Sequence, residues 1–585
     1  MAAPLKTIKD DGLKRAVFND FAGGLNLYKG ALDLNANESP DMLNVIPFPG
    51  KLQFRGGWTQ YSTLPFPADD AYAFYDSGGA LHYAVWANGN LYDVVSGAAV
   101  LIAASVYTSS SGVRIGHTQL NGILYWSTQT VAIQFWNPQL GTNGPVPQTG
   151  SSLVPCAQYL TVYTGAIVAF AINFTPGTPT NYQPNVFAWS AVNQPGNWTA
   201  ANSQAVGPTN GGHIEFGTQF GIAELGVAPF RNLIVGRADQ GIYAYQGALG
   251  SLAESVINCP VGCLDEGSVQ YLPSAQSFGT LVFLGTDGQV WATNGITAAP
   301  VSTPILPILG PAVQAALLTN NNQRFWSNYN QKWQYYYVDV AGTQFAYKWD
   351  INAWTKFSGW PTGPAFSVNT GGSVNFGVST LYIASSIAGN LVVAQVAVDG
   401  TNDNGSTPSV YYKTPWLHMG DPMKFKEYNW VAPYWYATGT NYTVNAVSLM
   451  RADGSQLTSG TLTFNAPAST MSSNPFILNI STLNSSATLG AASVFSTGTG
   501  VPIQNIARLY ATGTGTGVLQ GYAGASQMQG GAIQFTIAYS GGTMDYELIG
   551  LEIRYAEKGY LRDGGINYNP QGGVTGNDPI IGPNP

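Results

Sequence analysis

The side chains that could act as catalytic bases or metal ligands are few and widely separated. The four histidines, His82, His117, His213 and His418, never form an H-x-x-x-H or H-E-x-x-H pair. That spacing would place two imidazoles on one helical face around a zinc ion. We therefore expect all four to be packed or surface imidazoles.

The three cysteines form no framework. Cys156, Cys259 and Cys263 are odd in number, and the Cys259-x3-Cys263 pair lacks a second Cys or His pair at ligand spacing. Neither a disulfide scaffold nor a structural zinc site is indicated. We expect core or loop thiols.

Carboxylates and glycines show no catalytic pattern either. Asp265 and Glu266 are adjacent, too close in sequence to act as opposed arms across a glycosidase cleft. TDGQVW (286–291) is the nearest approach to a sialidase-like Asp-box, and neither G-x-x-x-x-G-K-[ST] nor G-x-S-x-G occurs. We predict no catalytic residue, no cofactor, no metal and no enzymatic activity.

Clustered aromatic residues leave two interpretations open. The stretch between 325 and 357 contains FWSNYNQKW, QYYYVDV and KWDINAWTKF. Trp349 and Trp354 could stack on a sugar ring, or such residues could fill the core of a β-sheet protein.

The overall composition indicates a β protein. Charged residues make up 9% of the chain, against about 25% on average, while 70 Gly, 33 Tyr, 25 Phe and 15 Trp are present. Aromatic residues suit pleated strands and glycine suits turns. The formal net charge of −8 argues against gripping nucleic acid through phosphate contacts. It is compatible with a channel through which DNA slides.

A hairpin recurs along the middle of the chain, as an apolar run, a tight turn with glycine and a second apolar run. The turn glycines are Gly89, Gly122, Gly165, Gly241, Gly288, Gly342 and Gly389, spaced by 33, 43, 76, 47, 54 and 47 residues. A hairpin repeated every 40 to 50 residues is typical of a β-propeller with one four-stranded blade per repeat. We predict six or seven blades, with an irregular sandwich as the alternative, and assign the 76-residue interval to an inserted loop at 172–185.

These patterns divide the chain into four parts. We predict an extended N-terminal docking arm (1–60), a β-propeller (61–405), a β-sandwich or jelly-roll-like domain (406–565) and an extended C-terminal tail (566–585). The chain shows neither a secretory leader nor an apolar run of the roughly 18 residues that a membrane span needs.

Several motifs resemble one protein family. Residues 21–58 contain G-G-L-N, then N-E-S-P-D-M-L-N, then P-G-K-L-x-x-R-G-G. This layout resembles the N-terminal segment of tail nozzle or stopper proteins of short-tailed bacteriophages. The segments AWSAVNQPGNW (188–198), 333–359, TPWLHMGDPMKFKEYNWV (414–431) and 507–560 resemble later parts of the same family in order.

The resemblance implies a virion protein made in the host cytoplasm. It implies a ring, usually a hexamer, that docks to the tail adaptor or head-to-tail connector, carries fibres or spikes and conducts genomic DNA without reading its sequence. The alternative is a propeller that binds a host receptor or carbohydrate.

Six residues are candidates for docking. Pro40 would fix an extended or turn conformation, while Met42, Leu43 and Val45 offer a short apolar anchor. Lys424 and Lys426 share one strand face by period-two spacing and could meet an acidic neighbouring subunit, or simply face solvent. The residues that line the channel are unknown.

Overall fold

The computed structural model describes residues 13–560 with internal gaps. The gaps are at 96, 111, 150–152, 176–182, 199–210, 216–223, 231–232, 239–240, 273–279, 321–322, 331–332, 370–378, 387–390, 397–401, 421–423, 438–440, 451–455, 460–461, 466–502, 505–506, 509, 512–525 and 540–545. The C-terminal tail lies outside the described residues, as does half of the loop at 172–185.

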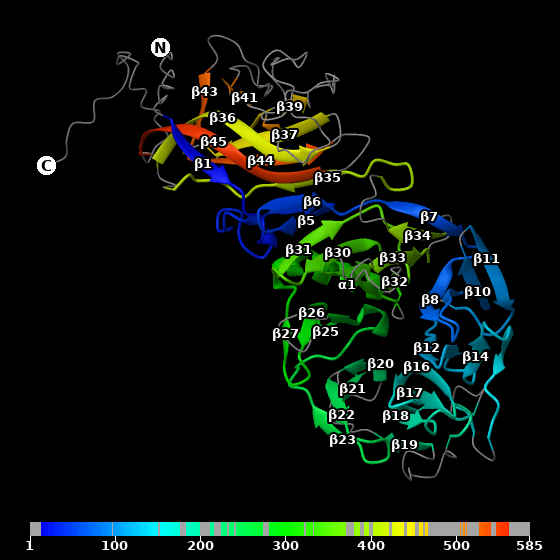
Figure 1. Cartoon of the computed structure of the whole chain (residues 1–585). Coiled ribbons are helices and arrows are strands. Elements are labelled where there is room, and N and C mark those ends of the chain that lie inside the picture. The colour runs from blue at the N-terminus through cyan, green and yellow to red at the C-terminus, as the bar shows by residue number, and fades with distance from the viewer. Residues whose placement is uncertain are drawn as a thin grey trace, which may run out of the picture.

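Seven four-stranded antiparallel sheets occur within the described residues, and they follow one another around a ring (Figure 1). The chain is an all-β propeller, as predicted. Blades 1 to 3 consist of β8 (Ala68–Tyr75), β9 (Leu81–Ala87), β10 (Asn90–Val95), β11 (Ala98–Ala103); β12 (Gly116–Leu120), β13 (Ile123–Ser127), β14 (Gln134–Asn137), β15 (Thr142–Pro145); and β16 (Cys156–Tyr163), β17 (Ala166–Asn173), β18 (Gln183–Trp189), β19 (Gly212–Glu215).

Blades 4 to 7 continue in the same way, except that the last blade takes its fourth strand from the start of the chain. Their strands are β20 (Glu224–Phe230), β21 (Leu233–Ala238), β22 (Ile242–Gln246), β23 (Ala253–Val256); β24 (Gln270–Leu272), β25 (Thr280–Leu284), β26 (Val290–Thr293), β27 (Ala298–Pro300); β28 (Trp326–Asn330), β29 (Tyr335–Val340), β30 (Thr343–Lys348), β31 (Ala353–Phe357); and β32 (Ala365–Asn369), β33 (Ser379–Ala384), β34 (Val392–Val396), β7 (Trp58–Thr63).

Six of the seven turn glycines fall in six different blades, and Gly389 lies outside the described residues. Asn88–Gly89, Asn121–Gly122 and Ala341–Gly342 have positive φ at both positions. This is the type I′ geometry that matches the twist of a two-residue hairpin. Gly122 and Gly165 lie in the first hairpin of their blades, whereas Gly89, Gly241, Gly288 and Gly342 lie in the second. This change of hairpin helps to explain both the short 33-residue and the long 76-residue interval, so the predicted insertion accounts for only part of the latter.

Apolar side chains fill the seven interfaces between neighbouring blades. The described core divides into seven clusters, each of which joins two adjacent blades around the ring. Strands β17 and β29 are buried along their whole length, because both faces of each blade are covered. This explains why they read as continuous apolar runs rather than as alternating ones.

Strand β7 closes the ring. It pairs antiparallel with β34, from Trp58 opposite Val396 to Thr63 opposite Val392. The first and last parts of the propeller are thereby joined in one sheet without a covalent link. The ring starts at Trp58, three residues before the predicted boundary.

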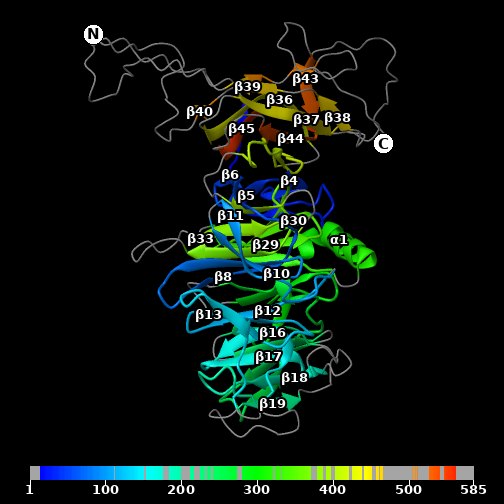
Figure 2. The ribbon, with the colours of Figure 1, turned by 90° about the vertical axis from the view of Figure 1, so that its right-hand side faces the viewer.

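One helix was not predicted. Helix α1 (Leu306–Thr319) connects β27 to β28 after a short 3-10 turn, η4 (Thr303–Ile305). It buries Leu309, Val313 and Ala316, and it lies on one face of the ring, seen edge-on in Figure 2. None of its residues is charged. A second 3-10 turn, η3 (Glu266–Ser268), precedes β24.

The second unit contains two larger sheets and lies on the rim of the ring beside β31 (Figure 1). The nine-stranded sheet contains β1 (Lys14–Phe18), β5 (Val45–Phe48), β6 (Lys51–Phe54), β36 (Lys424–Ala437), β40 (Ile503–Gln504), β41 (Ala507–Arg508), β42 (Tyr510–Ala511), β43 (Ser526–Gly530) and β45 (Tyr546–Tyr560). The six-stranded sheet contains β4 (Asp41–Leu43), β35 (Val410–Lys413), β37 (Asn441–Met450), β38 (Gln456–Ser459), β39 (Leu462–Asn465) and β44 (Ala532–Tyr539).

The N-terminal segment differs from the expected extended arm. β1 pairs with β45, β4 with β35, and β6 with β45, while β2 (Gly24–Leu25) and β3 (Glu38–Ser39) form a small parallel pair. Residues 14–54 therefore lie within the second unit, because their apolar side chains complete its core. Residues 1–12 lie outside the described part of the chain.

One apolar cluster connects the two units. It includes Phe21 and Met42 from the N-terminal segment, Phe535 and Leu551 from the two large sheets, and Tyr336 from blade 6. No described helix is long and apolar enough to cross a lipid bilayer.

Candidate functional site

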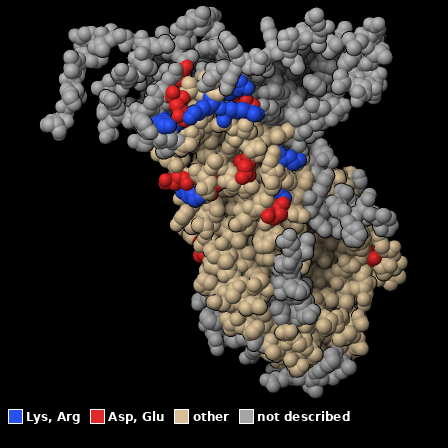
Figure 3. Space-filling model, turned by 60° about the vertical axis from the view of Figure 1, so that its left-hand side comes forward, with Lys and Arg blue, Asp and Glu red and all other residues tan. Residues whose placement is uncertain are grey.

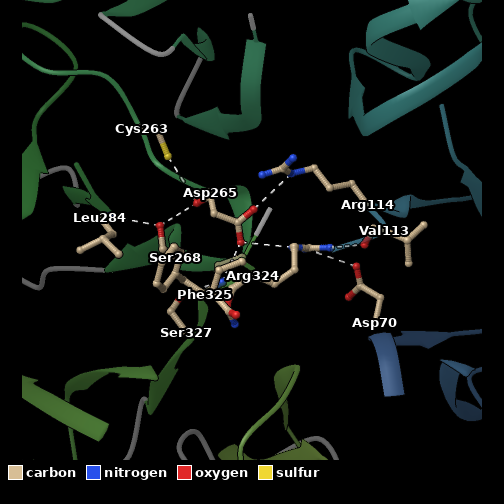
Figure 4. Close-up of polar contacts among 12 residues, drawn as sticks. Asp70, Val113, Arg114, Cys263, Asp265, Ser268, Leu284, Arg324, Phe325 and Ser327 are labelled. Carbon is tan, nitrogen blue, oxygen red and sulfur yellow. Dashed lines mark hydrogen bonds and ion pairs between the residues drawn. The ribbon is translucent and has the colours of Figure 1, made fainter. Parts of the chain in front are cut away.

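Four charged residues from different blades meet at the centre of the ring. Asp70 lies in β8, Arg114 precedes β12, Asp265 precedes β24 and Arg324 precedes β28. They thus come from blades 1, 2, 5 and 6, and residues from such distant blades can meet only near the ring axis. Figure 4 shows this axial network.

Asp265 is the hub of the axial network. Its carboxylate, which is fully buried, accepts from Nε of Arg114 at 3.4 Å, from Nε of Arg324 at 3.2 Å and from the backbone N–H of Phe325 at 3.0 Å. Arg324 also donates to the carbonyl oxygen of Val113 at 2.9 Å. One carboxylate therefore ties together the segments that precede β12, β24 and β28.

The axial network balances its charges internally. Burial opposes the charge of Arg324, but the carboxylates of Asp265 and Asp70 outweigh burial and raise the pKa of its guanidinium. Arg324 lies 3.6 Å from Asp70, which in turn lies 3.6 Å from His117. The network ties blades 1, 2, 5 and 6 together across the axis.

A second buried network, the junction clamp, joins the propeller to the second unit. Arg55 is fully buried and binds Asp403 with both terminal nitrogens, at 2.6 and 3.1 Å. Its Nε donates to Asn44 at 2.8 Å, and its terminal nitrogens also donate to the carbonyl oxygens of Gly56 at 2.6 Å and Ser358 at 2.5 Å. One guanidinium therefore holds the N-terminal segment, blade 6 and the segment after blade 7.

Two positions beside the junction clamp, 57 and 359, have no room for a side chain, which explains why both are glycine. A Cβ on Gly57 would lie 1.9 Å from the carbonyl oxygen of Asn402. Gly359 has φ +88°, and a Cβ there would lie 2.4 Å from Asp403. The R-G-G motif at 55–57 thus supplies one cation and a close backbone approach.

Burial dominates the ionisation of both clamp residues. It lowers the pKa of Arg55 despite the nearby Asp403, and it raises the pKa of Asp403 despite the nearby Arg55. The Arg55 guanidinium also lies 4.9 Å from the ring centroid of Trp360. The free-energy cost of removing these two charges from water therefore exceeds the free energy gained from their attraction.

The residues predicted to form an apolar docking anchor pack within the chain instead. Met42 and Val45 are buried in the core that connects the two units, and Pro40 and Leu43 are half-buried beside it. Met42 pairs with Tyr412 of β35. Met42 and Val45 cannot dock to another protein in this structure, because no solvent reaches their side chains.

The two candidate lysines do not share an environment, contrary to the period-two prediction. A register shift between Phe425 and Lys426 interrupts the alternation in β36. Lys424 pairs with Glu557 of its own chain at 3.2 Å and is partly exposed. Lys426 is buried, with Nζ 3.4 Å from the carbonyl oxygen of Gly531. Lys426 therefore cannot meet a neighbouring subunit.

The histidines and cysteines do not gather into a common site within the described residues. His82 contacts Asp93 at 2.8 Å, and His117 stacks on Trp86. None of the three cysteines forms a disulfide, and the described residues contain no group of three or more potential metal ligands.

The two tryptophans proposed for sugar stacking lie in a packed region. Trp354 is buried, stacks on Tyr347, and donates its indole N–H to the carbonyl oxygen of Val301 at 2.7 Å. Trp349 is half-buried against the same cluster. The core interpretation therefore holds for Trp354, which cannot stack on a ligand.

Sequence reasoning did not assign roles to the residues of either network. One signal was available, because Arg114 is separated from the next charged residue, Glu215, by 100 uncharged positions. An isolated cation in so uncharged a stretch indicates a buried carboxylate partner elsewhere in the fold.

Comparisons with known proteins assign this chain to no family. The sequence matches no family model and no curated protein. Similar solved structures include a chain of the mitotic checkpoint complex, with 11% identity and a TM-score of 0.36 over 59% of this chain and 93% of that one. Another is the extracellular domain of a protein from B. thetaiotaomicron described as a one component system, with 8% identity and a TM-score of 0.33 over 70% of this chain and 46% of that one. Neither likeness carries an argument about function.

Proposed function

We propose that this chain is a structural, non-catalytic component of a bacteriophage virion. In this proposal it is a tail nozzle that forms the distal DNA-conducting channel of a short tail and docks to adaptor and fibre proteins. The observation that carries the proposal is the position of the family-like motif. Asn44, Arg55 and Gly57, which belong to the motif at 21–58, are residues that join the propeller to the second unit.

The axial network supports a channel between copies rather than through one propeller. Ion pairs and hydrogen bonds cross the axis from blades 1, 2, 5 and 6. A DNA duplex about 20 Å wide would have to pass through a larger ring of several chains. A ring of this kind needs a head-to-tail interface that closes on itself.

The distribution of charge also supports this proposal. On the face in Figure 3 the charged side chains gather on and near the second unit, while most of the propeller surface carries none. Exposed uncharged surface suits contacts between subunits or a wall that does not attract phosphates.

The test is the composition and shape of the virion. We expect mass spectrometry of purified particles to detect this chain, and electron microscopy to place a ring of it at the distal end of the tail. The ring mass should be about six times 61.9 kDa. A monomeric protein absent from particles would exclude the proposal.

A further inference from the structure

Strand β11, the outer strand of blade 1, is an apolar edge strand. Its six residues read AAVLIA, and Val100 and Leu101 are 48% and 52% exposed. Val95, at the end of β10, is 45% exposed and lies opposite Ala98 of β11. Strand β10 pairs with one edge of β11, and no strand within the described residues pairs with the other edge. We call Val95, Val100 and Leu101 the blade 1 patch.

Four of the other six outer strands carry features that discourage contact between edges. Strands β15 and β27 end in Pro145 and Pro300, and β19 and β23 each contain a glutamate, Glu215 and Glu254. Proline and charge are the usual protections of an exposed sheet edge. Strand β11 has neither, and residues 94–113 around it are uncharged. Such an edge is typical of a surface that another chain covers.

A second apolar patch lies on the opposite side of the ring. Val256, at the end of β23, is 46% exposed, and Ile296, in the turn before β27, is 72% exposed. The backbone N–H of Asn258 donates to the carbonyl oxygen of Ile296 at 3.1 Å, which holds the two segments side by side. Residues 288–323 are uncharged. We call Val256 and Ile296 the blade 4/5 patch. Blades 4 and 5 lie across the ring from blade 1 (Figure 1).

We propose that the blade 1 patch of one copy of this chain packs against the blade 4/5 patch of the next copy. This inference deepens the nozzle function and rests on it, because that function requires a ring of copies. The contact is head to tail, so each copy uses one patch toward each of its two neighbours.

The number and position of the patches identify the occupant as a second copy. A two-fold dimer would use one patch twice, whereas a head-to-tail ring needs two different patches on different sides of each copy. This chain has two, and they lie across the propeller from one another. Both belong to uncharged stretches, so the two surfaces can meet without taking a charge out of water.

The test places one charge in each patch of the full-length chain. Leu101→Glu alters the blade 1 patch and Ile296→Glu alters the blade 4/5 patch. Both side chains are exposed, so the fold should be kept, which the melting temperature checks. In sedimentation velocity we expect the wild-type protein to form species larger than 61.9 kDa, and each variant to associate about tenfold or more weakly. The matched control is Leu32→Glu, an equally exposed leucine in the N-terminal segment, which should associate like the wild type.

Mixing the two variants shows whether the contact is head to tail. Leu101→Glu keeps an intact blade 4/5 patch, and Ile296→Glu keeps an intact blade 1 patch. An equimolar mixture should therefore form a dimer of about twice 61.9 kDa, although neither variant does so alone. If β11 instead paired with β11 of a second copy, Ile296→Glu would associate like the wild type and mixing would restore nothing. That result, or a wild-type protein that stays monomeric because β11 binds a different protein, would overturn the proposal.

Failure of this interface and failure of the nozzle function give different results. A ring of this chain at the end of the tail that still assembles with both substitutions would overturn the interface and leave the nozzle function standing. Self-association that both substitutions weaken, in a chain absent from virions, would leave the interface standing and exclude the nozzle function.

Discussion

Replacing Asp403 with asparagine should separate the electrostatic part of the junction clamp from its packing. The substitution keeps the shape of the side chain and leaves the Arg55 guanidinium buried without a counter-charge. Two charge-assisted hydrogen bonds, at 2.6 and 3.1 Å, are weakened or lost. At about 1.5–3 kcal/mol for each such bond, the free energy of unfolding should fall by about 3–5 kcal/mol, the range observed when one partner of a buried pair is removed.

Removing both charges should cost less than removing one. Because burial dominates the pKa of both partners, an apolar pair of similar size avoids the cost of taking two charges out of water. We expect the double variant Arg55→Met with Asp403→Leu to recover about half of the loss. The recovery should be incomplete, because the carbonyl oxygens of Gly56 and Ser358 lose their donor.

The assay is urea unfolding followed by tryptophan fluorescence, and a double-mutant cycle compares the double variant with its own single variants, Arg55→Met and Asp403→Leu. The matched control is Asp41→Asn, which removes a half-buried carboxylate that lies 3.2 Å from Lys356 and accepts from the Tyr411 hydroxyl at 3.1 Å, and it should cost less than about 1 kcal/mol. The reasoning would be refuted if Asp403→Asn were no more destabilising than Asp41→Asn, or if the two clamp substitutions were additive.

Four further substitutions probe other parts of the molecule. Asp265→Ala leaves two arginines without their shared carboxylate and should lower the free energy of unfolding by about 3 kcal/mol or more in urea titrations; no loss would mean that the axial network is not structural. Gly57→Ala places a methyl group 1.9 Å from a backbone oxygen and should lower the melting temperature. Gly310→Ala in α1, where the new methyl group has its nearest contact at 3.5 Å, should instead raise the free energy of unfolding by about 0.5–1 kcal/mol. Calorimetry of the two variants would contradict this if both behaved alike. Trp354→Ala should cost about 3–5 kcal/mol in chemical unfolding, and a stable variant with altered glycan binding would restore the sugar-stacking hypothesis.

The propeller could be predicted because its signals are local. A type I′ hairpin needs positive φ at two adjacent positions, and Asn88–Gly89 and Asn121–Gly122 supply them within a few residues. A glycine-containing turn in each repeat locates six of the seven blades, and the seventh such turn, at Gly389, lies outside the described residues. The turn glycines are unevenly spaced because they lie in the first hairpin of some blades and in the second hairpin of others. Composition alone does not reveal this difference.

The second unit could be predicted only in part, because its pairings are not local. Nothing around Lys14 indicates that it lies opposite Tyr555, and nothing around Asp41 indicates that it lies opposite Lys413. The apolar residues of PDMLNV fit a docking anchor and a core strand equally well. The deciding fact, that Met42 is buried by Tyr412 and its neighbours, depends on tertiary structure.

The site residues were missed for a related reason. Arg114, Asp265 and Arg324 are separated by more than 50 residues each and converge only because a ring brings its inner strands together. Asp265 was considered only as half of an adjacent acidic pair. Its role as a hub depends on blade order, which could not be derived before the number of blades was known.

Closing the ring and joining the two units are energetically linked. Pairing Trp58 with Val396 closes a loop of over 300 residues, which costs about 5 kcal/mol of chain entropy beyond a constant. Once that pairing exists, Asp41 and Lys413 are brought within a loop of about 30 residues, and closing it costs only about 3 kcal/mol. The junction clamp acts on the segment 358–364, which leads from blade 6 to blade 7, through the bond from Arg55 to Ser358. Loss of the clamp therefore weakens the closure on which the pairing of the N-terminal strands with the second unit depends.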